Sequence, residues 1–317
     1  MSIQPGAVSS PAVLATVRRL AADALAAEVI DAFRAEDIRS LLLKGPATTR
    51  WLYDEGTARL YRDVDVLVAP ADFDRAEALL ARLGLSYHLD AVAPDEQVAH
   101  ARRWMRQGHV VSLDLHRTLP GVGVDARRTW DVLSERTERC DVGGVDAETL
   151  AEPGRALLLA LHAASHGIRA SQPLADLQRG LARLDVSVWD EAATLAKRLG
   201  CHAAFAAGLL LLPQGAEVAA RTGMPDRLPP DVVLRASSPP DTAFGFERLA
   251  AARGARAKAR LLGREVVPTS SFMRAWSPMA ARSGAGLALA YLWRPLWLLL
   301  HARAGLNAWR RAQRDAR

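Results

Sequence analysis

Two aspartates that alternate with valine mark the first place where the sequence can support chemistry. Asp63 and Asp65 stand in an apolar run that ends at Val68. In a strand over 61–68 the side chains alternate between faces, so both carboxylates project from one face. Two carboxylates at such a short distance raise each other's proton affinity unless a cation lies between them. The spacing therefore predicts a site for a hard divalent metal ion.

A Lys-Gly-Pro turn precedes the two aspartates. Residues 41–43 are leucines and predict a short buried strand, which leads into Lys44, Gly45 and Pro46. We predict a helix over 47–53 with Pro46 in its first turn. A glycine allows the backbone to approach a ligand closely, and the free N–H groups of a helix start suit a phosphate. Lys44 adds a compact positive charge beside them.

This order of a strand, a glycine turn with a helix, and a second strand with Asp-x-Asp resembles the active-site signature of the DNA polymerase beta-type nucleotidyltransferase superfamily. The Lys44-Gly45-Pro46 turn before Asp63-Val64-Asp65 is similar to that of a bacterial branch, the nucleotidyltransferase family proteins. The resemblance covers residues 38–118. The superfamily usually has Gly-Ser or Gly-Gly at the turn, whereas proline has no N–H to donate.

The resemblance implies a third carboxylate on a later strand. Alternation over 110–116 predicts such a strand, with Asp114 and His116 on one face. By the resemblance, Asp63, Asp65 and Asp114 are the catalytic residues and the ligands of Mg²⁺ or Mn²⁺, and Asp114 takes the proton of the acceptor or ligates the metal. The implied reaction moves a nucleoside monophosphate from an NTP to a hydroxyl of an unidentified acceptor and releases pyrophosphate.

Four residues are expected to bind the nucleotide. Lys44 and Gly45 belong to the turn that would hold the phosphates. If the Asp-x-Asp strand extends backwards, Arg59 shares the face of the aspartates and contacts phosphate, while Tyr61 contacts the base or the sugar. A strand edge with a solvated arginine is the alternative. Arg102, Arg103 and Arg106 around Trp104 can help hold a triphosphate or an acidic acceptor, although an exposed loop over 91–107 is the favoured interpretation.

Three histidines are candidates for the acceptor side. His116 can reach the acceptor or hydrogen-bond a carboxylate. His162 and His166 share one face of a predicted helix, and Asp176 follows. A helix with this spacing, followed by an aspartate, resembles what comes after the catalytic domain in the bacterial family, where it lines the acceptor cleft or joins the domains. Zinc binding is a weaker reading because the glutamate of a metalloprotease helix is missing. A structural role is the alternative for each histidine.

Strand and helix patterns define an α+β fold in two domains. They alternate as far as a hairpin turn at 142–145, after which the patterns are helical. We predict a catalytic domain over 1–149, with N-terminal helices and a small mixed β-sheet nucleotidyltransferase core. An all-helical C-terminal domain is predicted over 150–317, ending in a basic aromatic tail.

Two segments of the helical domain have distinctive patterns. The proline-rich segment 213–240 predicts a surface excursion. The segment 287–314 predicts an aromatic helix pair broken at Pro295. Its tryptophans and leucines beside arginine are compatible with peripheral membrane contact, although packing against the helical domain or a second subunit is the favoured interpretation.

Composition restricts the class of protein. The 317 residues are 50% hydrophobic and 24% charged, which is typical of soluble globular proteins. Two cysteines are too few for a disulfide framework, and no export signal is evident at the N-terminus, so we predict a cytoplasmic protein. No apolar run is long enough to predict a transmembrane helix.

Charge is distributed unevenly along the chain. Residues 251–317 contain thirteen Lys or Arg and two acidic residues, a net charge of +11, whereas residues 1–250 sum to −5. A basic segment of this kind can bind nucleic acid, an anionic membrane or an acidic partner, or it can form a solvated face. The alternative function is therefore a non-catalytic protein that binds nucleic acid or an anionic surface. A carboxylate pair for glycoside hydrolysis is a weaker reading, because the Lys-Gly turn has no role in it.

Overall fold

The computed structural model describes residues 11–54, 59–61, 63–88 and 100–316. Residues 91–99, which belong to the loop predicted over 91–107, lie outside these residues. The chain divides into two compact units. Unit 1 contains Met1–Tyr87, Ala101–Thr118 and Ala126–Ala151, and unit 2 contains His88–His100, Leu119–Asp125 and Glu152–Arg317.

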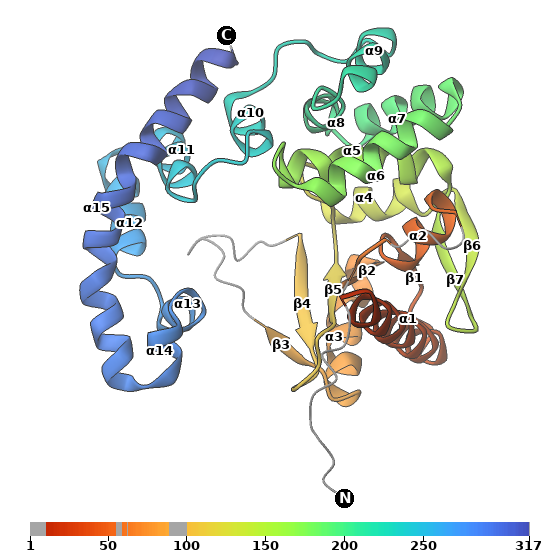
Figure 1. The fold of residues 1–317 in the computed structure, drawn as a ribbon, viewed down its shortest axis with the longest axis horizontal. Helices are drawn as coiled ribbons and strands as arrows, with labels where there is room; N and C mark the ends of the chain where they lie inside the picture. The colour runs from red at the N-terminus through yellow and green to blue at the C-terminus, as the bar shows by residue number, and fades with distance from the viewer. Residues whose placement is uncertain (1–10, 55–58, 62, 89–99, 317) are drawn as a thin grey trace, which may run out of the picture. The chain divides into compact units, whose positions relative to one another are not determined.

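A mixed seven-stranded sheet has the strand order β3-β4-β5-β2-β1-β7-β6 (Figure 1). The pairs β2–β5 and β1–β7 are parallel, whereas β1–β2, β4–β5 and β6–β7 are antiparallel. The strands are β1 (Ser40–Leu42), β2 (Asp63–Val68), β3 (Ser86–His88), β4 (Ala101–Met105), β5 (Ser112–His116), β6 (Thr137–Val142) and β7 (Val145–Leu150). The hairpin predicted at 142–145 is confirmed.

Helices of unit 1 cover one face of this sheet. Val64 and Val66 of β2 belong to one buried cluster with Phe33 of α1 and Leu80 of α3. The alternation predicted for β2 is thereby confirmed, because the valines enter the core and the aspartates leave on the other face. The helices are α1 (Pro11–Ala35), α2 (Pro46–Leu52), α3 (Phe73–Arg82) and α4 (Ala126–Leu133), with a 3₁₀ turn at Pro70–Asp72.

From Glu152 onward the described part of unit 2 consists of helices and the loops between them, which confirms the α+β prediction with a helical C-terminal region. Its helices are α5 (Glu152–His166), α6 (Ser171–Arg183), α7 (Val186–Arg198), α8 (His202–Leu209), α9 (Pro213–Arg221), α10 (Pro230–Ala236), α11 (Thr242–Ala251), α12 (Ala255–Val266), α13 (Ser270–Trp276), α14 (Pro278–Arg282) and α15 (Gly284–Asp315). None of the described helices combines the length and apolar character that a bilayer crossing requires.

Three predictions about elements were wrong. The loop predicted over 91–107 contains β4, whose Trp104 is buried. The excursion predicted over 213–240 contains α9 and α10, because their prolines occupy the first helical turn, where no N–H is needed. The helix pair predicted at Pro295 is one helix, α15. Contacts beside Pro295 stabilise this continuous helix. Arg294, for example, donates a hydrogen bond to the Glu265 carbonyl oxygen.

Candidate active site

Parallel pairing of β2 with β5 brings the predicted carboxylates together. In this register Asp65 lies opposite Asp114, and Leu67 lies opposite His116. Because adjacent strands are about 4.8 Å apart and side chains alternate, residues in register share a face of the sheet. Asp63, two residues before Asp65 on β2, projects from the same face. Unit 1 therefore presents three carboxylates from two neighbouring strands.

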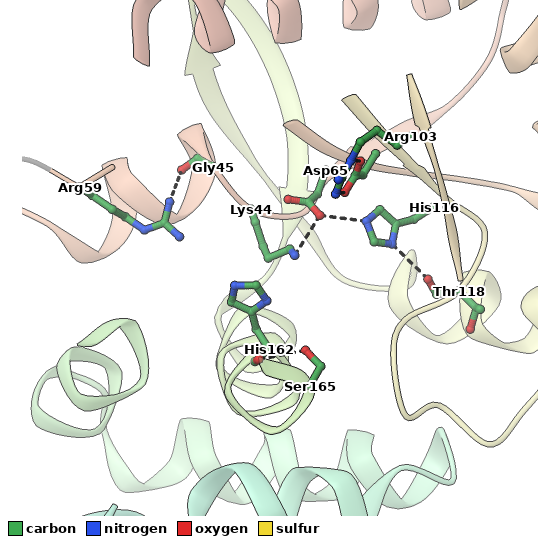
Figure 2. Close-up of polar contacts among 10 residues, drawn as sticks. Lys44, Gly45, Arg59, Asp65, Arg103, His116, Thr118, His162 and Ser165 are labelled. Carbon is green, nitrogen blue, oxygen red and sulfur yellow. Dashed lines mark hydrogen bonds and ion pairs between the residues drawn. The ribbon is translucent and has the colours of Figure 1, made fainter. Parts of the chain in front are cut away.

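Asp65 is the buried centre of this group. Its side chain is 4% exposed, and its Oδ1 lies 2.9 Å from Lys44 Nζ and 2.9 Å from His116 Nε2 (Figure 2). Burial favours the protonated acid, but the charge of Lys44 and the hydrogen bond from His116 outweigh it and hold the pKa of Asp65 well below its usual range. Asp65 is therefore an anion whose charge is balanced inside unit 1.

The backbone around Lys44 explains its position. β1 runs antiparallel to β2, and the Leu43 N–H donates to the Asp65 carbonyl oxygen at 2.9 Å, so Lys44 follows directly beside Asp65. At Gly45 the chain turns with φ +65°. A Cβ there would lie 3.0 Å from the Asp63 carbonyl oxygen. Both the conformation and the close approach require glycine at this position.

Arg103 pairs with Asp114 through two hydrogen bonds. The antiparallel register of β4 and β5 places the two residues opposite each other. Nε of Arg103 lies 2.9 Å from Oδ1, and Nη2 lies 3.1 Å from Oδ2. Such a two-pronged contact is among the stronger charge-assisted interactions. The sequence analysis grouped Arg103 with the arginines around Trp104 and favoured an exposed loop there. It did not predict the pairing with Asp114, although alternation around the apolar Trp104 was a usable signal.

Asp63 differs from the other two carboxylates. It is half-buried at the start of β2, and within the described residues no other side chain hydrogen-bonds it. Burial raises the pKa of the Asp63 carboxyl, the charges of Asp65 and Asp114 raise it further, and the charge of Lys44 opposes them. An additional cation beside Asp63 would relieve this repulsion.

Mg²⁺ or Mn²⁺ fits the chemistry of these donors, because hard cations prefer carboxylate oxygen. In the part of the chain that the structure describes, no three His, Cys, Asp or Glu side chains are arranged to hold a metal ion. Both oxygens of Asp114 face Arg103, and one oxygen of Asp65 faces Lys44 and His116. Joint ligation by all three carboxylates therefore requires Arg103 to leave Asp114.

Arg59 and Tyr61 precede the strand, because β2 begins at Asp63 and does not extend back to them. Arg59 is buried, with Nη1 3.5 Å from the Gly45 carbonyl oxygen, and its guanidinium lies over the Tyr61 ring. The Tyr61 hydroxyl donates to Asp23 of α1 at 2.5 Å, and burial together with this hydrogen bond raises the pKa of Tyr61. Both residues lie at the glycine turn, and their contacts with a nucleotide stay predictions.

The three candidate histidines are divided between the two units. His116 is 2% exposed in unit 1, where Nδ1 lies 3.3 Å from the Thr118 carbonyl oxygen while Nε2 faces Asp65. It therefore hydrogen-bonds a carboxylate, which agrees with that predicted contact and equally with a structural role, and its contact with an acceptor stays a prediction. His162 and His166 lie on α5 in unit 2, with their ring centroids 4.5 Å apart. Their acceptor-side role stays a prediction.

A family model described as "Uncharacterised nucleotidyltransferase" matches residues 9–214. The chain belongs to this family. The match contains every candidate site residue of this family member, from Lys44 to His166, and ends before α10. No curated protein matches the sequence.

Three solved structures resemble part of this chain at low sequence identity. A solution structure of the antibiotic-resistance factor ANT(2'')-Ia is 11% identical, with a TM-score of 0.41, and covers 58% of this chain and 94% of that chain. A crystal structure of ANT(2'')-Ia with adenylyl-2''-tobramycin is 13% identical, with a TM-score of 0.42, covering 56% and 97%. An antigenic nucleotidyltransferase-like protein from Paracoccidioides brasiliensis is 14% identical, with a TM-score of 0.35, covering 59% and 91%.

Proposed function

We propose that this family member transfers a nucleoside monophosphate from an NTP to a hydroxyl of an acceptor, with a divalent metal, and releases pyrophosphate. The register that sets Asp65 beside Asp114 carries this proposal. This register brings carboxylates of two neighbouring strands to one face of the sheet, and Lys44 adds a positive charge beside them. Family membership supports the reaction class.

Asp63, Asp65 and Asp114 would hold Mg²⁺ or Mn²⁺. When bound, such an ion neutralises the triphosphate and lowers the pKa of the acceptor hydroxyl. The depressed pKa of Asp65 keeps this carboxylate ionised at neutral pH. Asp63, which no described side chain hydrogen-bonds, offers its oxygens without losing a partner.

Lys44 and Arg103 are the cations we assign to the phosphates. Lys44 lies 2.9 Å from Asp65, and Arg103 lies 2.9 Å from Asp114. Small side-chain movements would free both cations for the triphosphate. The guanidinium of Arg103 suits two phosphate oxygens at once. The start of α2 contributes less than expected, because the helix has seven residues and Pro46 lacks an N–H.

Asp114, once free of Arg103, is placed to accept the proton of the acceptor hydroxyl. The acceptor oxygen then forms a bond to the α-phosphorus, and the bond to the bridging oxygen of pyrophosphate breaks. Pyrophosphate leaves with that electron pair. Gly45, Arg59 and Tyr61 complete the proposed nucleotide side of the site at the turn before α2.

The test is transfer of label from α-labelled NTPs. The protein is incubated with each NTP, Mg²⁺ or Mn²⁺, and fractions of a host lysate, and the fraction that gains label identifies the acceptor class. We expect Asp63→Asn and Asp65→Asn each to lower labelling by about a hundredfold or more. Asp74→Asn is the control, because Asp74 is an exposed aspartate on α3. Absence of labelling by the native protein, or full labelling by Asp65→Asn, would contradict the proposal.

A further inference from the structure

An apolar stripe runs along the exposed face of α15. Five leucines are between 48% and 77% exposed: Leu289, Leu292, Leu296, Leu299 and Leu300. Their spacing of three or four residues places them on one side of a helix. Trp293, which is 44% exposed, borders this leucine stripe. The stripe is continuous through the N-terminal half of the helix.

The other side of α15 is fixed within unit 2. In Figure 1, helices α11 to α14 lie along one side of α15, and each of them contacts it. Ala290 packs with Phe272 and Met273, and Ala312 packs with Leu234 and Ala243. Arg294 is buried in the same interface, where it forms an ion pair with Glu265. The leucine stripe is therefore not needed to hold α15 in place.

Arginines continue the face of the stripe towards the C-terminus. Arg303 follows Leu296 by two helical turns, Arg310 follows Arg303 by the same interval, and Arg314 follows one turn later. All three are exposed. One face of α15 thus changes from leucine to arginine along its length, within a segment of net charge +11.

We propose that this face of α15 binds an anionic membrane surface. The leucines and Trp293 enter the boundary between headgroups and acyl chains, while the arginines contact acidic headgroups. Charge favours this occupant over a second copy of the chain, because two segments of +11 repel each other. Nucleic acid would satisfy the arginines and leave the leucines in water. The proposal does not depend on the transfer reaction.

Vesicle co-sedimentation of the full chain tests the proposal. We expect binding to phosphatidylcholine vesicles that contain phosphatidylglycerol, and binding at least about tenfold weaker to phosphatidylcholine alone. Added salt should weaken the binding, because it screens the headgroup charge. Equal binding to both vesicle types would overturn the proposal.

Two sets of variants separate the apolar and basic contributions. The double variant Leu292→Glu, Leu299→Glu should reduce vesicle affinity by about tenfold or more. Arg303→Gln and Arg310→Gln should each reduce it by about fivefold. The matched control is Leu210→Glu, since Leu210 is 43% exposed and lies outside α15. Thermal unfolding of every variant should match that of the native chain, because each substituted side chain is exposed.

Three results would reject a membrane role. The first is unchanged vesicle binding by the double leucine variant. The second is self-association without vesicles that this variant abolishes, which would assign the stripe to a second copy. The third is loss of vesicle binding in Leu210→Glu to the same degree, which would show a non-specific effect of added negative charge.

Discussion

Asp63 and Asp65 lie two residues apart on β2, yet their surroundings shift their pKa values in opposite directions. Burial raises the pKa of Asp63, and neighbouring carboxylates add to that effect. Asp65 is also buried, but Lys44 and His116 lower its pKa. A carboxyl with a depressed pKa stabilises the fold above its unfolded pKa of about 3.9, and this stability is lost as the pH falls. A carboxyl with a raised pKa has the opposite effect, so the ionised Asp63 costs stability.

The two asparagine variants should therefore differ in stability without metal. At neutral pH we expect Asp65→Asn to lower the free energy of unfolding by about 3 kcal/mol, because Lys44 loses its buried partner. Asp63→Asn should raise it, because it removes a repelling charge. Urea unfolding measures both effects, and each should shrink as the pH approaches the acidic range. Equal stability of the two variants at neutral pH would contradict this account of the site.

Arg103 should compete with a metal ion for Asp114. Arg103→Gln frees both carboxylate oxygens, so we expect it to raise the affinity for Mn²⁺ by about tenfold without nucleotide. Titration calorimetry measures this affinity. Arg102→Gln is the matched control, since Arg102 is the neighbour on β4 and pairs with Glu77. A lower Mn²⁺ affinity in Arg103→Gln would show that Arg103 supports the metal site.

Strand alternation predicted which faces the acidic residues occupy, whereas the approach of Asp114 to Asp63 and Asp65 was implied by the family resemblance. Val64 and Val66 identified the buried face of β2, and the same pattern identified Asp114 and His116 on β5. The pairing of Arg103 with Asp114 was not predicted, because it depends on the register between β4 and β5, and residues 91–107 were assigned to a loop. The hydrogen bond between Tyr61 and Asp23 was not predicted either, because it joins the segment before β2 to α1.

The turn between β1 and α2 is the element that positions both Lys44 and the strand of aspartates. We expect Gly45→Ala to destabilise the protein by more than about 2 kcal/mol, because its Cβ would approach the Asp63 carbonyl oxygen. Gly84→Ala is the matched control. Gly84 also has positive φ, but a Cβ there meets nothing within 4 Å, so its cost should stay near about 1 kcal/mol. Thermal unfolding compares the two, and equal losses would show that the contact at Gly45 is unimportant.

Local patterns predicted the existence of elements better than their ends. The Gly143-Gly144 turn and the strands around it followed from residue type alone. Proline was misread in unit 2, because its effect depends on its place within a helix. At Pro213 and Pro230 it begins a helix, and at Pro295 packing around Arg294 maintains one. Sequence periodicity does not reveal such packing.

At the scale of the whole molecule, the family match and the basic segment occupy different parts of the chain. The match ends at residue 214, whereas α15 begins at Gly284. We expect Mg²⁺ and a bound NTP to slow amide hydrogen exchange in β1, β2 and β5, and to leave α11 to α15 unchanged. Asp74→Asn should show the same protection, and Asp65→Asn should not. Protection that extends into α15 would indicate that the two functions are coupled.

The pairing of β1 with β7 has a consequence for biosynthesis. Leu42 lies opposite Thr149, whose hydroxyl donates to the Leu42 carbonyl oxygen at 2.7 Å across 107 positions of sequence. While the ribosome is still making the intervening chain, this edge of β1 has no neighbour, and exposed strand edges favour aggregation. We therefore expect β1 to favour aggregation of the growing polypeptide until residue 150 has left the exit tunnel, and a chaperone or rapid elongation would limit that period.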